Sequence, residues 1–488
     1  MARQYHWSLP VLLPLLLGAC APGPKLAPAK MPAPSHYLAS PGDWSASGQQ
    51  LSWQKTPSSA WWRLFGSATL DQDVQTALQA NPSIRQARSA VLRAQQIEKE
   101  AAAGFLPQVS ANAQLERSRA LRTGADGGTR YRIPGNLYSL LLGSVVVSYS
   151  PDLFGRTADQ VHSAQAQQQV EAARLQATRQ YVAAAVAKAL ITAAAAREQW
   201  QTAQRIADAD AKLLKLIHQE YHLGASNLQV LRQQEALTAS ARAAVAPLRV
   251  AMAHAEHALA VLLGKYPDQK LPSPSLHELH LPKDLPVLVP SSLLEQRPDI
   301  VAARATVRAA AAEAHLAAAD RYPQINIGAD IGKAAQSGAL FFNPASTLWG
   351  LAGSLVAPIY AGGALHAQEK AAVDSYQMAV EQYHGVVLTA FRQVADALRA
   401  LQGADQSYAQ RRIAAAAAGQ ALHLAQARYR DGVTDYATVL NAEIANQQDQ
   451  EAVLRAQSER YLDSVALFLA MGEGPKLSPH DSVQETRP

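Results

Sequence analysis

The sequence predicts a mixed α and β protein, built from a tandem repeat that gives each chain four amphipathic strands and several long helices. Three observations support this prediction. Four segments alternate apolar and polar residues over the length of a strand, long alanine-rich segments have the composition of helices, and both kinds of segment occur twice in the same order. Strands of about ten residues have the length that crosses a bilayer obliquely in a β-barrel.

Composition excludes several classes of protein. Of the 488 residues, 48% are hydrophobic and 17% are charged, which is too apolar for a disordered chain and too charged for a bundle of membrane-spanning helices. The net charge of +5 is not concentrated in a basic run, so nucleic-acid binding is not indicated. The single cysteine excludes a disulfide scaffold and a multi-cysteine metal site.

The N-terminus has the pattern of a secretory signal. An apolar stretch over residues 9–17 follows Arg3 and is too short to span a bilayer. The tetrapeptide Leu17-Gly18-Ala19-Cys20 resembles a bacterial lipobox. This resemblance implies that residues 1–19 are removed as a signal peptide and that Cys20 carries the lipid. The alternative is an ordinary signal peptide with an incidental cysteine.

The segment after the signal is predicted to be an extended, lipidated tether. Residues 20–60 are rich in Pro, Ser and Gly. Ala21 follows the cysteine, so there is no aspartate at this position to indicate retention at the inner membrane. In this respect the chain resembles lipoproteins that are sorted to the outer membrane.

The first copy of the repeat occupies residues 61–280. Its predicted elements are a helix over about 71–103, a strand from 109, a strand over about 137–149, and a helical region over roughly 157–263 with a break near Gly224. Gly104 and Pro107 end the first helix, and the motif from Pro151 to Arg156 ends the second strand.

The second copy occupies residues 281–472 and is followed by a flexible tail over 473–488. Its predicted elements are a helix over about 293–320, strands over 325–331 and 349–356, and helices to about 471 with a break near Gly432. Landmark residues keep their register between the copies, since Pro82 and Pro107 match Pro298 and Pro323 at one constant offset. The chain is therefore predicted to be a tandem duplication.

Each predicted strand has one apolar face. In the first strand, Val109, Ala111, Ala113 and Leu115 alternate with Ser110, Asn112, Gln114 and Glu116. Such a face packs on a core in a soluble protein and contacts acyl chains in a membrane. Four strands cannot close a barrel, so transmembrane strands have to be pooled between chains. Two chains would give about eight strands with a filled lumen, and three would give about twelve with room for a passage.

The motifs of the chain and their order resemble the outer-membrane factor family, the TolC- and OprM-like channels of tripartite efflux systems. The similarity extends from about Trp61 to Gly472 and is strongest to the NodT-type outer-membrane lipoproteins. The matching motifs are Trp62–Gly66, Leu78–Ile84, Pro151–Arg156, Glu295–Ile300, Pro358–Gly363 and Tyr429–Val433.

This resemblance implies a homotrimer in the outer membrane of a Gram-negative bacterium. The implied fold is a 12-strand transmembrane β-barrel, with four strands per protomer, continued by a long periplasmic α-helical barrel. The implied function is a passive exit duct for drugs or other small molecules, delivered by an inner-membrane pump and a periplasmic adaptor protein. No cofactor, catalytic motif or metal site is expected. The pump class stays open, and the alternative function is a lipid-anchored helical scaffold or adhesin without a pore.

The resemblance also implies that periplasmic helix tips close the tunnel and dock the adaptor. The sequence predicts a turn at Gly403-Ala404-Asp405, and the repeat offset places the matching tip near Ala195. Because closure in the family uses acidic residues just above the tips, Asp208 and Asp210 are the candidate gate. The alternative is that both are solvated residues on a helix surface.

Two other groups of residues have structural interpretations. His218 and His222 have the spacing of a metal-binding pair, but without a third ligand a metal site is not predicted. The corners between strand and helix are expected to be structural, with capping and pairing by polar side chains. The corner residues are Pro151, Asp152, Arg156, Pro358, Gly362 and Gly363.

Overall fold

The computed structural model describes residues 23–29, 31–38, 49–53, 59–119, 122–124, 131–133, 137–269, 271–272 and 275–472. The predicted signal peptide, the lipidation site Cys20 and the predicted tail over 473–488 lie outside the described residues. The chain divides into two compact units. The sheet unit contains Arg93–Gln168 and Ala305–Glu381, and the hairpin unit contains Lys30–Leu92, Gln169–Arg304 and the chain from Gln382 onward.

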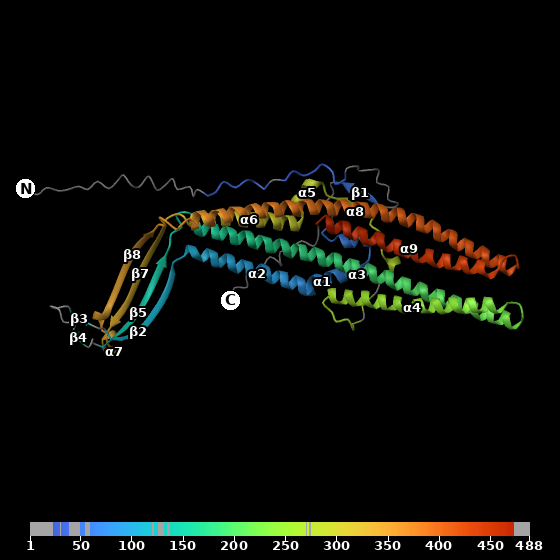
Figure 1. Cartoon of the computed structure of the whole chain (residues 1–488), viewed down its shortest axis with the longest axis horizontal. Helices are drawn as coiled ribbons and strands as arrows, with labels where there is room; N and C mark the ends of the chain where they lie inside the picture. Colours follow the sequence, from blue (N-terminus) through green and yellow to red (C-terminus); the bar gives the residue numbers. More distant parts are fainter. Residues whose placement is uncertain are drawn as a thin grey trace, which may run out of the picture. The chain divides into compact units, whose positions relative to one another are not determined.

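The sheet unit is built on a four-stranded antiparallel sheet (Figure 1). Its strands, in their order across the sheet, are β2 (Gln108–Arg119), β5 (Leu137–Tyr149), β7 (Gln324–Ala335) and β8 (Thr347–Val356). The first two come from the first copy of the repeat and the last two from the second, so the pairing of β5 with β7 joins the copies. The connection between β2 and β5 carries a short antiparallel ribbon of β3 (Arg122–Gly124) and β4 (Tyr131–Ile133). The connection between β7 and β8 carries the helix α7 (Gly338–Phe341).

The register of this sheet gathers apolar side chains on one face. One row of paired residues crosses all four strands and consists of Ala111, Val145, Ile331 and Trp349. The adjacent row, on the opposite face, consists of Ser110, Val146, Asp330 and Gly350. The alternation that the sequence predicts is therefore present, with a continuous apolar face and a mixed polar face.

Each copy of the repeat also contains a helical hairpin, and the two hairpins have the same dimensions. The long helices α3 (Arg156–His222) and α8 (Ala364–Arg430) each have 67 residues. Their shorter partners α4 (Leu228–Leu262) and α9 (Tyr436–Ala470) each have 35. At 1.5 Å rise per residue the longer helices extend about 100 Å. This equality supports the predicted tandem repeat.

The helix before each pair of strands is divided, although the sequence analysis predicts one continuous helix. α1 (Ala68–Ala80) and α2 (Pro82–Ala102) meet at Asn81, and α5 (Pro290–Gln296) and α6 (Pro298–Ala319) meet at Arg297. A proline displaces the preceding residue from the helical region. The backbones of Asn81 and Arg297 are accordingly extended, with ψ of 128° and 123°.

The residues at these two breaks cap the last helix of their own copy. Asn81 Nδ2 donates to the carbonyl oxygen of Leu262 at 2.8 Å, and Arg297 Nη1 donates to that of Ala470 at 2.8 Å. Such bonds satisfy carbonyl groups that a helix end leaves without partners. In each copy, a hydrogen bond therefore joins the break between the first two helices to the C-terminal end of the last helix.

A small sheet and an aromatic cluster complete the hairpin unit. β1 (Gln50–Trp53) pairs in parallel with β6 (Asp284–Val287). β1 lies within the predicted tether, so this part of the tether is a strand held by the second copy of the repeat. The ring of Trp61 stacks on Phe468 with a centroid distance of 5.0 Å. Among the helices of the described chain, none has the length and apolarity needed to cross a membrane.

Candidate functional site

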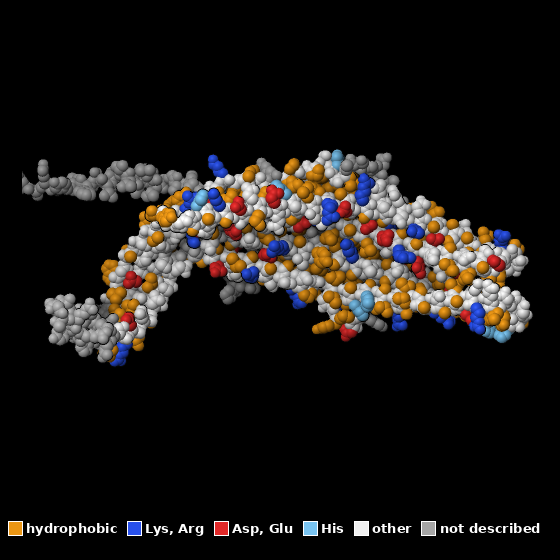
Figure 2. Space-filling view, viewed as in Figure 1, with side chains coloured by type: hydrophobic (Ala, Val, Ile, Leu, Met, Phe, Trp, Pro, Cys, Tyr) orange, Lys and Arg blue, Asp and Glu red, His pale blue; other side chains and the backbone are white. Residues whose placement is uncertain are grey.

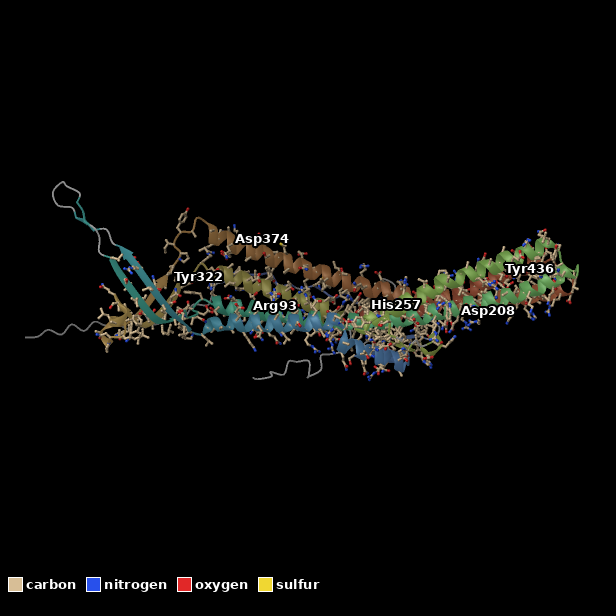
Figure 3. The ribbon with its side chains drawn as sticks, turned by 90° about the horizontal axis from the view of Figure 1, so that it is seen from below. Arg93, Asp208, His257, Tyr322, Asp374 and Tyr436 are labelled. Carbon is tan, nitrogen blue, oxygen red and sulfur yellow. The ribbon has the colours of Figure 1, made fainter. Side chains whose placement is uncertain are left out.

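The turns of the two helical hairpins lie together at one end of the hairpin unit (Figures 1 and 3). The first turn joins α3 to α4 at Gly224, whose φ is 75°. Ala225 N donates to Glu220 O at 2.8 Å, which closes the end of α3. Asn227 then begins α4, because its side chain accepts from Val230 N at 3.0 Å.

The second turn, between α8 and α9, repeats this chemistry. Gly432 has a φ of 69°, and Val433 N donates to Arg428 O at 2.8 Å. Asp435 takes the role of the capping residue and accepts from Thr438 N at 3.0 Å. A glycine in the left-handed region and an Asx cap three residues later therefore define both turns.

The positions predicted for the helix tips are wrong. Gly403, Ala404 and Asp405 lie inside the continuous helix α8, and Ala195 lies inside α3. An isolated glycine costs a helix only about 1 kcal/mol. Gly403 is not among the glycines with positive φ, and Gln406 rather than an Asx residue lies three positions after it. The combination of glycine and Asx cap, present at Gly224 and Gly432, is the signal that identifies the turns.

The residues predicted as adaptor contacts are also largely buried. Ala195 and Ala404 pack against other helices, and Asp405 forms an ion pair with Arg460 at 2.8 Å. The guanidinium of Arg460 lies over the ring of Tyr408, 4.5 Å from its centroid. Ala195, Ala404 and Asp405 therefore contribute to the helix packing of the protomer, whereas Gly403 is exposed on the side of α8.

The turns, by contrast, expose large hydrophobic residues. Leu223 is 84% exposed and Val433 is 63% exposed. Acidic, basic, histidine and hydrophobic side chains share the visible surface at this end (Figure 2). His218 and His222 contact each other with ring centroids 4.6 Å apart. Within the described part of the chain, no group of three or more His, Cys, Asp and Glu residues could hold a metal ion.

The two acids predicted as the gate point in different directions. Asp208 is exposed and accepts from Gln204 at 3.2 Å, whereas Asp210 is 0% exposed. Residues two positions apart on a helix are separated by about 200°, so they cannot share one face. Asp210 is therefore neither part of an acidic ring with Asp208 nor a solvated surface residue, and both expectations for it are wrong. Figure 3 marks Asp208, together with Tyr436 of α9.

Asp210 instead belongs to a buried polar cluster between the two hairpins. Its backbone carbonyl accepts from Gln234 Nε2 at 3.3 Å and from Thr238 Oγ1 at 3.2 Å, both on α4. Tyr436 of α9 donates its hydroxyl to Gln234 Oε1. The buried Glu443, also on α9, interacts with the Asp210 carboxyl. The cluster thus connects three helices of two hairpins.

Burial perturbs the protonation of both acids. It raises the pKa of Asp210 above its ordinary value, against the opposing effects of Glu443 and Gln447. It also raises the pKa of Glu443 to about 7, and the negative charge of Asp210 adds to this shift. A hydrophobic cluster lies between these acids and the turns. Its buried members are Ile217, Leu231, Ala425, Tyr436 and Val439.

The strand-to-helix corners hold their helices by polar contacts. Asp152 Oδ2 accepts from Ala158 N at 2.8 Å in the first turn of α3. Arg156 pairs with Asp320 at 2.8 Å and not with Asp152. At the second corner the chain turns through glycines with positive φ. After Pro358, Gly362 and Gly363 have φ values of 61° and 84°, and Pro151 precedes the matching Gly155 at 80°.

The comparison with known families identifies the class of protein. The family model described as outer membrane efflux protein matches residues 74–265 and 289–473. The chain therefore belongs to the outer membrane efflux protein family. It is an outer-membrane channel component of an efflux system and not an enzyme, and such a component works with pump and adaptor partners.

Individual relatives match over nearly the whole chain. It is 30% identical over 478 residues to the pyoverdine export outer membrane protein OpmQ of Pseudomonas putida, covering 95% of this chain and 97% of that protein. It is 27% identical over 477 residues to the cation efflux system protein CusC of Escherichia coli O157:H7, covering 96% and 98%. The solved outer-membrane channel OprN matches with a TM-score of 0.82 at 24% identity, covering 93% of this chain and 99% of that one. The predicted family, the mixed helix-and-strand fold of TolC-like channels and the function as an outer-membrane channel component of an efflux system are confirmed.

Proposed function

We propose that three copies of the chain close a 12-strand barrel in the outer membrane, which continues into a helical tunnel in the periplasm. The four-stranded sheet, with its apolar face and its edge strands β2 and β8, carries this proposal. Open edges are not tolerated in hydrocarbon, because each unsatisfied backbone group costs several kcal/mol. Pairing β8 of one protomer with β2 of the next removes every edge, and about twelve strands leave room for a passage.

The mass of the detergent-extracted protein tests this assembly. We expect native mass spectrometry to give three chains per particle, because four strands per chain are too few to close a barrel. Circular dichroism of the same sample should show both helix and strand. A monodisperse monomer with the same helix and strand content would contradict the proposed barrel.

The proposed cargo is a small molecule that a pump and its adaptor deliver. OpmQ is named for pyoverdine export and CusC for cation efflux, so relatives of this chain serve small-molecule and ion export. A water-filled lumen distinguishes cargo mainly by size and charge. We infer that the pump sets most of the selectivity and that this chain provides a passive exit for drugs or similar compounds.

We further propose that the hairpin turns dock the adaptor. Leu223 and Val433 expose apolar surface at the turns, whereas the positions first predicted, Ala195, Ala404 and Asp405, are buried. Of the two candidate gate residues, only Asp208 is exposed on its helix. Three copies of Asp208 facing a common axis would form a single acidic ring that attracts cations.

We propose that the mature protein begins at Cys20 and that this residue carries a lipid. The Leu17-Gly18-Ala19-Cys20 motif and the absence of a second cysteine support this proposal. Residues 20–60 would then lead from the lipid to repeats over 61–280 and 281–472.

Labelling with palmitate in cells tests the lipid anchor. We expect label in the wild-type protein and none in Cys20→Ser, because no other cysteine is available for the lipid. Since a lipid chain is only one of two membrane attachments, the variant should still insert its barrel. Equal labelling of the two proteins would contradict the assignment.

A further inference from the structure

The pair formed by Asp210 and Glu443 has an unusual environment, because in the described part of the chain these two buried acids lie together and no basic side chain perturbs either of them. Asp210 is 0% exposed and Glu443 is buried as well. Among the described residues, neither carboxylate oxygen of Asp210 nor Oε2 of Glu443 has a hydrogen-bond partner of good geometry. Besides burial, each acid shifts the pKa of the other, and Gln447 lowers that of Asp210.

Every helix that surrounds the pair contributes neutral groups. α4 contributes Gln234 and Thr238, whose donors bond backbone carbonyls: Gln234 Nε2 bonds that of Asp210, and Thr238 Oγ1 bonds those of Gln234 and Asp210. α8 contributes apolar residues and the Tyr429 phenol, whose pKa is raised by burial. α9 contributes Gln447 and the Tyr436 phenol, whose pKa burial also raises. One further acid, Glu220, acts on the phenols of Tyr429 and Tyr436 and raises their pKa values.

Two buried carboxylates cannot both keep their charge at short range in such a space. One of them has to hold a proton, or a cation has to lie between them. A divalent cation such as Ca²⁺ takes six to eight oxygen ligands. Among the described residues, no third acidic, histidine or cysteine side chain joins the pair to complete such a set. The geometry therefore favours a proton.

We propose that Asp210 and Glu443 share one proton that fastens the α3–α4 hairpin to the α8–α9 hairpin, and that losing this proton loosens the two hairpins. In the protonated pair one carboxyl donates and the other accepts, so the buried charge is reduced to one. Release of the proton to water leaves two facing carboxylates. Their repulsion and their demand for water then favour separation of the hairpins.

The direction of the pH dependence follows from the raised pKa of Glu443. Because the pKa of Glu443 is higher in the packed state than its ordinary value of 4.5, protonation of this carboxyl stabilises the packed state. This stabilisation is complete below pH 4.5. This contribution is lost as the pH rises through about 7, the pKa of the packed state. From pH 6 to pH 8 the equilibrium for packing should therefore weaken roughly tenfold.

Hydrogen exchange of the full-length protein in detergent tests the shared proton. The readout is the protection of amides in α3 and α9 beside the pair, corrected for the intrinsic effect of pH on exchange. We expect protection in the wild type to fall roughly tenfold from pH 6 to pH 8. Glu443→Gln should abolish this dependence, because an amide can donate to Asp210 at every pH. The matched control is Glu235→Gln on α4, whose partner is the exposed Arg232, and it should behave as the wild type.

Three results would overturn the proposal. The first is a pH dependence in Glu443→Gln equal to that of the wild type. The second is recovery of wild-type protection at pH 8 on adding Ca²⁺, reversed by a chelator, which would identify a cation site. If Glu443→Gln does not assemble, Asp210→Asn provides the same comparison. The third result that would overturn the proposal is a pH dependence in Asp210→Asn equal to that of the wild type.

The shared proton does not depend on the proposed function, whereas its effect on passage does. If the hairpins close a tunnel, conductance in a planar bilayer should rise from pH 6 to pH 8 in the wild type and stay constant in Glu443→Gln. Constant conductance in both proteins, with the exchange result intact, would refute the role in passage and leave the shared proton standing.

Discussion

Leu351→Arg should abolish assembly in the outer membrane, because it places a guanidinium in the middle of the apolar face of the sheet. Leu351 lies near the centre of β8 and pairs with Ala329 of β7. In the single chain it is 73% exposed, which means that the protomer itself does not cover it. An arginine at the midplane of a transmembrane β-barrel costs about 2–4 kcal/mol, and each copy in an oligomer carries one. We expect folded protein to disappear from the outer-membrane fraction, as measured by sedimentation and immunoblotting.

The neighbouring residue provides a matched control. Ala352 pairs with Gly328 on the opposite face of the same strands. That face lines the lumen in the proposed barrel, where an arginine remains hydrated, so Ala352→Arg should assemble at normal levels. It should also shift the ion selectivity of the channel toward anions. Equal loss of both variants, or equal tolerance of both, would mean that the Leu351 face does not contact lipid.

The strands and their faces could be predicted, because the pattern that determines them lies within each short segment of the sequence. An alternation of two residues determines which side chains share a face, and the row through Ala111, Val145 and Ile331 follows once the strands pair in register. The pairing of β5 with β7, which joins the two copies, is seen only in the structure. The β1–β6 pairing was not predicted, because it joins short segments far apart in the chain, Gln50–Trp53 and Asp284–Val287, and no periodicity in either segment indicates the other.

The hairpin turns were predictable, but they were assigned to the wrong positions. The sequence predicts breaks near Gly224 and Gly432, but the prediction of a helix tip at Gly403 is wrong, because that glycine stands alone in an alanine-rich helix. What ends a helix is a glycine that adopts positive φ together with the cap of the next helix. Asn227 and Asp435 supply that cap, and a search for both signals at once would have selected the observed turns.

The burial of Asp210 could not be predicted in the same way. An alanine-rich helix shows little contrast between its faces, so its sequence does not reveal which side packs against a neighbour. The separation of about 200° between Asp208 and Asp210 was available from helix geometry, and it excludes a ring that contains both. Which of the two is buried depends on α4 and α9, whose contacts with α3 arise only in the folded hairpins.

Asp405→Ala should destabilise the protomer by about 3–5 kcal/mol, because it leaves the Arg460 guanidinium buried without its carboxylate. The pair links α8 to α9 at 2.8 Å, and its side chains are only 5% and 12% exposed. We expect a clear fall in the midpoint of thermal unfolding of the purified protein. Replacing both partners by apolar residues, as in Asp405→Leu with Arg460→Met, should recover much of this loss, since no uncompensated charge then remains.

An exposed ion pair on the same helix separates this effect from a general loss of charge. Arg392 and Asp396 lie 2.9 Å apart with side chains 66% and 63% exposed, so Asp396→Ala should cost only about 0.3–0.5 kcal/mol. The comparison also decides the role of Asp405. If Asp405→Ala unfolds at the wild-type temperature but binds an adaptor more weakly, then Asp405 is a docking residue, as the sequence alone suggested. If it unfolds earlier while any protein that remains folded binds normally, the carboxylate serves the packing of α8 against α9, and docking belongs to the turns at Gly224 and Gly432.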